Sequence, residues 1–181
     1  MKVLSLFDGI SCGQQALKEL NISLDKYYSS EVNKYAIAIT QYNFPDTIQL
    51  GDINNWRKWD IDWSSIDLVM GGSPCQGFSF AGKQLNFEDP RSKLFFVYVN
   101  ILNHIKKQNT NVKFLLENVR MKKEYQDIIS KYLGVNPVII NSALVSAQNR
   151  VRLYWANWDI EQPEDKGVLL KDILELSLIH I

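Results

Sequence analysis

Cysteine and histidine are scarce in this sequence of 181 residues. The two cysteines, Cys12 and Cys75, lie in unrelated sequence contexts, and only His104 and His180 could add imidazole nitrogens. None of these residues has the short spacing of a zinc site, so no metal is expected. Two isolated thiols without a disulfide framework indicate a reducing, cytoplasmic compartment.

Long apolar runs and an excess of one charge are also missing. No apolar run approaches the length that spans a bilayer, and the N-terminus has no cleavable signal pattern, so we expect no membrane segment. Twenty basic and twenty acidic residues give a net charge of zero. This balance disfavours a protein that holds nucleic acid tightly by charge alone. A nucleic-acid substrate therefore has to be inferred from particular residues.

The chain does contain alternating apolar runs and amphipathic stretches, which are typical of a βαβ series. Strands are expected at residues 3–7, 26–30, 47–50, 66–70, 113–116, 138–140 and 153–156. Helices are expected at residues 14–20, 33–42, 92–107 and 122–132. The pattern predicts an α/β fold, with one mostly parallel sheet and helices on both of its faces.

Polar or Gly-rich clusters come directly after four of the expected strands: Asp8-Gly9, Glu31, Gly71 to Cys75, and Glu117-Asn118. In open α/β sheets, ligands bind at the carboxyl ends of the strands. We therefore expect these clusters to meet in one cleft.

The turn that contains Gly9 and Gly13, together with Glu31 and Asp52, favours a nucleoside-containing cofactor. Gly9 and Gly13 allow a ligand to approach the backbone closely. Glu31 ends the second strand, where an acidic residue commonly binds ribose hydroxyls, and Asp52 follows the third. The spacing is not that of a dinucleotide-binding loop, and a tight turn without a ligand would explain the glycines equally well.

Cys75 lies in a loop rich in glycine and proline, where backbone N–H groups could stabilise a thiolate. Ser79 follows it in a polar segment that is long enough to close over a substrate. A loop cysteine without any function is the simpler reading of this segment taken alone. Cys12 is expected to pack in the interior.

A carboxylate and two arginines complete the set of candidates. Glu117 closes a buried strand, and such a carboxylate can share a proton with a substrate nitrogen. At strand spacing, Gln148, Arg150 and Arg152 share one face, where the arginines could hold a carbonyl oxygen or a phosphate. Alternatively, Glu117 is a capping or salt-bridged residue, and the arginines lie on a solvated edge strand.

Taken together, these segments resemble the motifs of the cytosine-C5 DNA methyltransferase family. SLFDGISCG resembles its first cofactor motif, and GGSPCQGFSFAGK its catalytic loop. FEDPRSKLFF resembles the helix entry that follows, FLLENV the Glu motif, and QNRVRLYWANW the Gln-x-Arg-x-Arg motif. The order and spacing match from Lys2 to Trp158, and four motifs in order are far more specific than any one of them.

The resemblance implies a Rossmann-like fold and an S-adenosylmethionine-dependent activity on double-stranded DNA. Cys75 would attack carbon 6 of a flipped-out cytosine, Glu117 and Arg152 would bind the base, and Arg150 would order the catalytic loop. Ser79 and Gln148 would contact the substrate. The residues that the motif positions imply as cofactor contacts are Phe7, Asp8, Gly9, Glu31, Val32, Asp52, Ile53, Pro74 and Leu94.

The resemblance also predicts how the chain is divided. Residues 1–158 would form the catalytic domain, and residues 159–181 would begin a connection to a target-recognition region that this sequence lacks. We therefore expect weak or no activity from the chain alone, and we expect a longer parent sequence.

Three other functions stay open. The first is methylation of tRNA by the same chemistry, although Ser73 before Pro74 favours DNA over the Pro-Pro-Cys-Gln of the RNA-modifying branch. The second is a non-catalytic or split subunit that a second polypeptide completes. The third is a nicotinamide-dependent oxidoreductase, which would leave Cys75, Glu117 and Arg152 without a joint purpose.

Overall fold

The computed structural model describes residues 1–74 and 93–174; Cys75 and Ser79 lie outside this range. The described residues form a seven-stranded sheet with the order β3-β2-β1-β4-β5-β7-β6. The strands are β1 (Lys2–Leu6), β2 (Lys26–Ser30), β3 (Ile48–Gln49), β4 (Leu68–Gly71), β5 (Lys113–Val119), β6 (Val138–Asn141) and β7 (Val151–Ala156).

Neighbouring strands from β3 to β5 pair in parallel, with Val3 beside Tyr27 on one side and Leu68 on the other. β7 lies between β5 and β6 and runs antiparallel to both, so that Leu116 faces Trp155 and Ile139 faces Leu153. The prediction of a mostly parallel sheet is confirmed. The alternative prediction that Arg152 lies on a solvated edge strand is wrong, because β7 is an inner strand.

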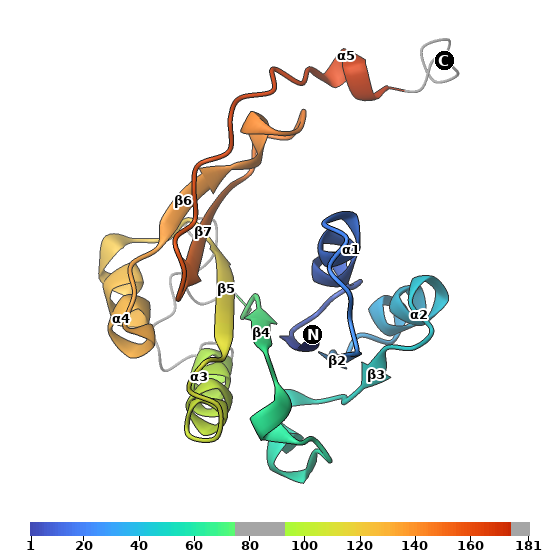
Figure 1. Cartoon of the computed structure of the whole chain (residues 1–181). Coiled ribbons are helices and arrows are strands. Elements are labelled where there is room, and N and C mark those ends of the chain that lie inside the picture. The colour runs from blue at the N-terminus through green and yellow to red at the C-terminus, as the bar shows by residue number, and fades with distance from the viewer. Residues whose placement is uncertain (75–92, 175–181) are drawn as a thin grey trace.

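Helices cover both faces of the sheet, as predicted (Figure 1). α1 (Cys12–Glu19) and α2 (Lys34–Asn43) lie on one side, and α3 (Lys93–Lys106) and α4 (Lys123–Leu133) lie on the other (Figure 1). Short 3₁₀ helices form η1 (Ile53–Lys58), η2 (Trp63–Ser65) and η3 (Ser142–Leu144). Residues 157–174 leave the sheet as an extended segment that ends in the one-turn helix α5 (Leu170–Ile173) (Figure 1).

Local sequence sets where these helices begin and end. The Asn33 side chain accepts hydrogen bonds from the backbone N–H groups of Tyr35 and Ala36, which caps α2. Asp52 caps η1 in the same way. α4 ends at Gly134, whose φ of 77° is the left-handed conformation that glycine adopts at little cost.

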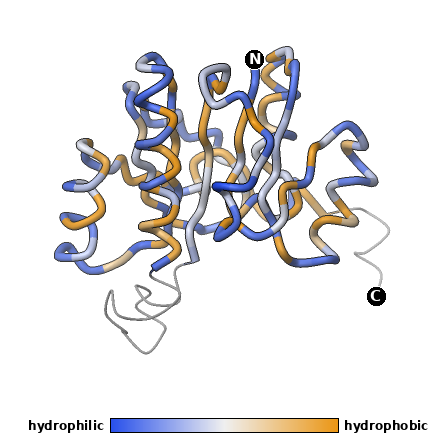
Figure 2. The backbone as a smooth tube through the Cα atoms, turned by 90° about the horizontal axis from the view of Figure 1, so that it is seen from below, coloured by the Kyte–Doolittle hydropathy of each residue, from blue (hydrophilic) through white to orange (hydrophobic). Residues whose placement is uncertain are grey.

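The main hydrophobic core lies between the sheet and the α3–α4 layer. The side chains of Leu4, Phe95, Tyr98, Phe114 and Trp155 are fully buried in it. A smaller cluster around Val3, Leu17 and Tyr27 fills the space under α1. Apolar and hydrophilic stretches alternate along the helices, as an amphipathic packing layer requires (Figure 2).

Two expectations fail at the level of single elements. β5 was expected to end at Leu116, but it continues to Val119, so Glu117 and Asn118 lie inside the strand. β7 supplies partners as far as Val119, which prolongs the strand beyond its apolar run. Cys12 was expected to pack in the interior, but it is exposed at the start of α1.

Within the described ranges, no helix is long and apolar enough to cross a bilayer.

Candidate active site

The turn after β1 is conformationally strained. Phe7, Gly9 and Ser11 all have positive φ values, of 59°, 61° and 62°. Phe7 and Ser11 carry side chains, and left-handed backbone costs such residues energy. Strain of this kind persists only where the surrounding contacts hold it, and it is common at functional sites.

The Asp8 carboxylate holds this turn. It accepts hydrogen bonds from the hydroxyl groups of Ser5 (2.5 Å), Tyr27 (2.8 Å) and Ser11. Burial, and then the negative charge of Asp8, raise the pKa of Tyr27. The phenol therefore stays protonated and donates a hydrogen bond to Asp8. Asp8 was expected to contact a cofactor; its side chain is engaged within the protein.

Glu31 ties the same turn to the end of β2. Its Oε2 accepts from the backbone N–H of Gly9 at 2.8 Å, and its Oε1 accepts from those of Val32 and Asn33, each at 2.8 Å. Three donors therefore orient one carboxylate at the edge where the strands end. The convergence that the sequence predicts for Gly9 and Glu31 is confirmed.

A pocket of about 340 Å³ opens beside this carboxylate. It is lined by Phe7, Ser30, Glu31, Val32, Asp52, Ile53, Asn54, Pro74 and Leu94. All the expected cofactor residues except Asp8 and Gly9 belong to this lining. Its walls are mostly apolar, and its two carboxylates come from the ends of neighbouring strands.

Asp52 adds the second carboxylate. Its Oδ1 accepts from the backbone N–H and the side-chain amide of Asn54, both at 2.9 Å. Its other oxygen has no partner among the described residues, so it is open to a donor in the pocket. Ser30 donates to the carbonyl of Gly51 at 2.7 Å, which joins the loop that carries Asp52 to the end of β2.

Glu117 and Arg152 form the second feature of the site. Arg152 Nε lies 2.8 Å from Glu117 Oε1, in an ion pair that is not aligned as a hydrogen bond. The pair is diagonal across two strands, because Glu117 is opposite Tyr154 and Arg152 is opposite Val119. Glu117 keeps 33% of its side chain exposed and Arg152 keeps 18%, so a substrate could reach both.

The segment that leads to Cys75 is held against this pair. A Cβ atom built on Gly72 would lie 3.2 Å from Glu117 Oε2, so only a glycine allows this approach without displacing the carboxylate. The Asn118 side-chain amide donates to both the carbonyl and the hydroxyl of Ser73, at 3.2 Å each. Pro74, the next residue, lines the pocket. Residues 72–74 therefore connect the pocket to the ion pair.

Gln148 and Arg150 differ from expectation in their local structure. Both precede β7 and are exposed, so the strand alternation predicted for them with Arg152 is wrong. Asn141 Oδ1 accepts from the backbone N–H of Arg150 at 3.0 Å, and Ser142 Oγ donates to the carbonyl of Gln148 at 2.7 Å. These contacts fix an irregular segment rather than a strand, because polar residues of β6 and η3 bind the backbone there.

The contact between Asn118 and Ser73 was not predicted from the sequence. Asn118 was noted only as the neighbour of Glu117, yet its side chain is 2% exposed. A buried amide needs partners within the protein, so an asparagine after an apolar run was the available signal. The hydroxyl groups around Asp8 gave no comparable signal, because Tyr27 comes from β2 and serines such as Ser5 and Ser11 are common in and beside turns.

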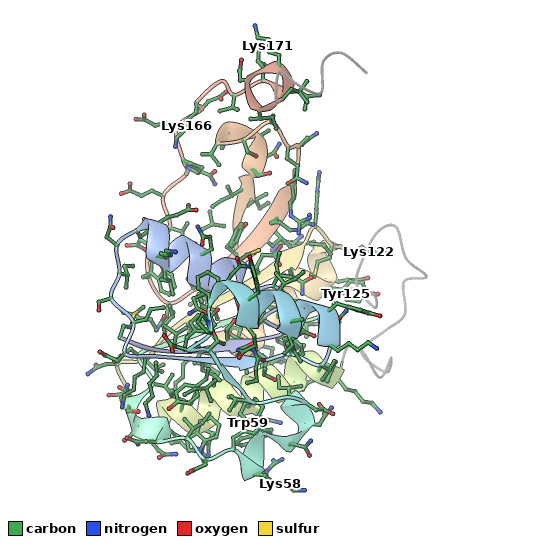
Figure 3. The ribbon with its side chains drawn as sticks, turned by 90° about the vertical axis from the view of Figure 1, so that its right-hand side faces the viewer. Lys58, Trp59, Lys122, Tyr125, Lys166 and Lys171 are labelled. Carbon is green, nitrogen blue, oxygen red and sulfur yellow. The ribbon has the colours of Figure 1, made fainter. Side chains whose placement is uncertain are left out.

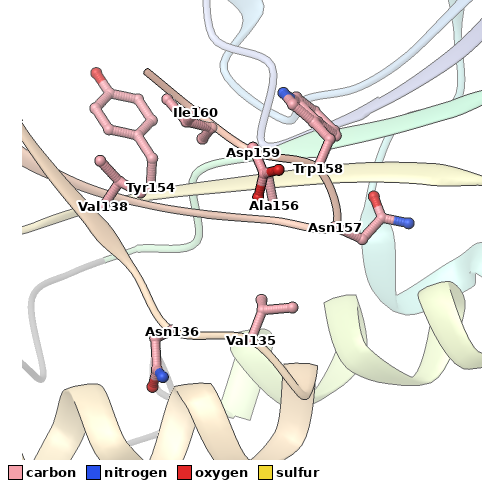
Figure 4. Close-up of a pocket in the computed structure, with 9 residues that line it drawn as sticks. All are labelled: Val135, Asn136, Val138, Tyr154, Ala156, Asn157, Trp158, Asp159 and Ile160. Atoms are coloured by element: carbon pink, nitrogen blue, oxygen red, sulfur yellow. The ribbon is translucent and has the colours of Figure 1, made fainter. Parts of the chain in front are cut away.

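A second hollow, of about 480 Å³, has Tyr154 in its wall (Figure 4). It is lined by Val135, Asn136, Val138, Tyr154, Ala156, Asn157, Trp158, Asp159 and Ile160 (Figure 4). Burial, and then the charge of Glu117, raise the pKa of Tyr154, so its phenol stays neutral. None of the expected site residues lines this hollow, whereas seven of the expected cofactor residues line the pocket beside Glu31.

The sequence of this chain was compared with models of known protein families. The family model for C-5 cytosine-specific DNA methylases matches residues 1–163. The chain belongs to this family.

Curated relatives agree with this membership. The type II methyltransferase M.NlaIV of Neisseria lactamica is 31% identical over 174 residues, an alignment that covers 93% of this chain and 38% of the relative. M.HgiCI of Herpetosiphon aurantiacus is 36% identical over 178 residues, with 91% of this chain and 40% of the relative covered. The chain thus spans about two fifths of the length of these curated relatives.

The fold has counterparts among solved structures of DNMT2 proteins. The Spodoptera frugiperda DNMT2 structure superposes with a TM-score of 0.63 at 23% identity, over 93% of this chain and 54% of the other. The DNMT2 methyltransferase of S. pombe gives 0.56 at 22% identity. These structures support the Rossmann-like methyltransferase fold of this C-5 cytosine methylase chain.

Proposed function

We propose that this chain carries the catalytic machinery that transfers a methyl group from S-adenosylmethionine to carbon 5 of a flipped-out cytosine in DNA. The observation that carries the proposal is the arrangement of residues 72–74. They run from the Glu117–Arg152 pair to the pocket beside Glu31, and Cys75 is the next residue in the chain. Membership of the methylase family implies the methyl donor.

The pocket beside Glu31 fits the donor's chemistry. Apolar walls from Phe7, Val32 and Leu94 suit a flat adenine ring. The Glu31 and Asp52 carboxylates are acceptors for ribose hydroxyls, and Asp52 keeps one oxygen open. When bound, S-adenosylmethionine supplies its methyl group as an electrophile. Asp8 would act indirectly, by holding Phe7 and Gly9 in their strained conformations.

The ion pair suits the polar edge of cytosine. Ring nitrogen 3 and the carbonyl oxygen at position 2 are both bonded to carbon 2, so the groups that bind them must lie side by side. The 2.8 Å contact between Glu117 and Arg152 meets that condition. Glu117 would share a proton with nitrogen 3 and accept from the exocyclic amine, and Arg152 would donate to the carbonyl oxygen.

Cys75 would act as the nucleophile. Its thiolate sulfur would bond to carbon 6, and the electron pair of the 5,6 double bond would then be available at carbon 5. Hydrogen bonds from Glu117 and Arg152 would stabilise the charge that spreads onto the ring. After methylation, loss of the carbon 5 proton would expel the sulfur. Arg150 would order the catalytic loop, and Ser79 and Gln148 would contact the substrate.

We also propose that recognition of a DNA sequence needs more protein than this chain. Its span of 38–40% of the curated relatives, together with its net charge of zero, gives few means of holding a duplex. Residues 159–181 would connect residues 1–158 to such a region. Turnover by the chain alone is therefore expected to be weak.

A covalent trap tests the chemistry without requiring turnover. A duplex carrying 5-fluorocytosine should form a denaturation-resistant complex with the chain and S-adenosylmethionine, because fluorine cannot leave as a proton does. Cys75→Ser should abolish the complex, and the exposed thiol offers a matched control in Cys12→Ser, which should retain it. Trapping that survives Cys75→Ser would contradict the proposal, and stronger trapping by fluorinated RNA would redirect it from DNA to RNA.

A further inference from the structure

Three cations are concentrated where β5 leads into α4. Arg120 follows the strand, Lys122 occupies the N-cap position of the helix, and Lys123 begins it. They lie on a hollow of about 510 Å³ whose lining is Arg120, Met121, Lys122, Lys123, Gln126, Asn136, Pro137 and Ile139. Figure 3 shows Lys122 close to Tyr125 at this end of the helix.

The cations of this cluster are largely unpaired. Lys123 binds Asp127 at 2.6 Å, as an exposed pair one helical turn apart. Arg120 and Lys122 have no acidic partner among the described residues, and the hollow contains no carboxylate. The cluster therefore presents a net positive surface on a chain whose overall charge is zero.

The placement of Lys122 works against helix stability. N-cap positions favour Ser, Thr, Asp or Asn, and α2 and η1 have such residues in Asn33 and Asp52. Lys122 makes no side-chain cap, and its charge lies at the positive end of the helix dipole. A residue that breaks a local rule without a compensating contact is often retained for function.

The cluster is also close to the base-binding pair. Arg120 is three residues after Glu117, so at most about 11 Å of chain separates them. Phosphates along one DNA strand are about 3.4 Å apart along the helix axis, so this reach corresponds to about three phosphates. Resting on the function proposed above, we propose that Arg120 and Lys122 bind the phosphodiester backbone of DNA beside the target cytosine.

Binding of a fluorescent duplex at several salt concentrations tests this contact in the full chain. Arg120→Gln and Lys122→Ser should each lower the slope of log affinity against log salt by about 0.9, which is roughly an eightfold loss at 0.1 M salt. Lys122→Arg should restore the binding. Lys131→Gln, at the far end of the same helix, is the matched control and should leave the slope unchanged.

A second readout separates this role from a structural one. Lys122→Ser supplies a preferred cap, so it should raise the melting temperature by about 2–4 °C while weakening DNA binding. Equal slopes for Lys122→Ser, Arg120→Gln and Lys131→Gln, or no binding of the duplex by the wild-type chain, would overturn the inference. The salt slope is read from reversible binding of an ordinary duplex, whereas trapping is read from the covalent complex with 5-fluorocytosine, so a failure of the trapping experiment and a failure of this contact can be told apart.

Discussion

The Asp8 carboxylate makes the turn after β1 possible. Left-handed backbone at Phe7 and Ser11 costs energy that three hydroxyl donors to one carboxylate can offset. This turn places Phe7 in the wall of the pocket and directs the Gly9 N–H to Glu31. Asp8 thus shapes the proposed cofactor pocket without lining it.

Asp8→Asn should therefore destabilise the protein by about 2–3 kcal/mol, since hydrogen bonds to a charged group are lost and an amide N–H₂ faces hydroxyl donors. Urea unfolding followed by circular dichroism measures the change. Asp46→Asn, at an exposed position, is the control and should change stability by less than about 0.5 kcal/mol. An unchanged midpoint for Asp8→Asn would show that the turn is held by other contacts.

Tyr98 should make the fold sensitive to alkaline pH. Burial raises the pKa of Tyr98 above its ordinary value of 10.0, so the folded chain keeps a proton that the unfolded chain releases above that pH. The stabilisation is complete below pH 10 and declines as the pH rises further, by about 1.4 kcal/mol per pH unit for each such group.

Tyr98→Phe should remove this contribution and give a shallower decline of unfolding free energy between pH 10 and pH 11.5. The variant should also lose about 1 kcal/mol at neutral pH, because the Tyr98 hydroxyl donates to the carbonyl of Leu115 at 3.3 Å. Tyr42→Phe is the control, since that side chain is 88% exposed. If both variants retain the wild-type slope, the folded chain releases the Tyr98 proton in the same range as the unfolded chain.

At the scale of elements, β4 brings the site together because Gly71 lets Tyr98 of α3 pack directly on the strand. A Cβ atom on Gly71 would lie 2.9 Å from the Tyr98 ring and 3.0 Å from the Leu6 carbonyl oxygen. Both neighbours are in rigid, buried surroundings, so neither can move away cheaply.

Gly71→Ala should consequently cost about 1–3 kcal/mol through overpacking. Gly134→Ala is a useful comparison, because a Cβ atom there meets nothing within 4 Å and only the φ of 77° opposes it. Its cost should be about 1 kcal/mol, and Gly134→Asn should recover part of it. Thermal unfolding of the three variants would distinguish the causes: a larger loss for Gly134→Ala than for Gly71→Ala would contradict the packing argument.

The element boundaries show which signals a sequence contains. Lys26–Ser30 and Lys93–Lys106 were predicted closely, because an apolar run or a helical stripe is a local property of the chain. The extension of β5 over Glu117 and Asn118 depends on pairing with β7, whose residues are more than thirty positions away. The irregular segment at Gln148 and Arg150 depends on Asn141 and Ser142 in the same way. Contacts between residues so far apart in the sequence cannot be predicted from the local pattern of apolar and polar residues.

At the scale of the whole molecule, the sequence predicted that the polar clusters meet at one edge of the sheet, but it did not predict the order of the strands. Clusters at the ends of parallel strands must meet at one edge, and Phe7, Glu31, Asp52 and Pro74 do line one pocket. The antiparallel insertion of β7 between β5 and β6 was not visible in the apolar pattern. That insertion places Arg152 beside Glu117. The family resemblance implied that both residues bind the base, but the ion pair between them was not predicted.

All the residues that line the proposed cofactor pocket belong to residues 7–94, and the walls come from the strand ends and the start of α3. Cofactor binding should therefore be separable from action on DNA. S-adenosylmethionine at about 100 times its dissociation constant should stabilise the chain by about 2.7 kcal/mol without DNA, which corresponds to a rise of about 5–10 °C in melting temperature. Asp52→Asn should reduce the shift at a fixed ligand concentration, while Asp46→Asn should preserve it. A melting temperature that stays constant up to millimolar ligand would mean that these walls need a further segment to close the pocket.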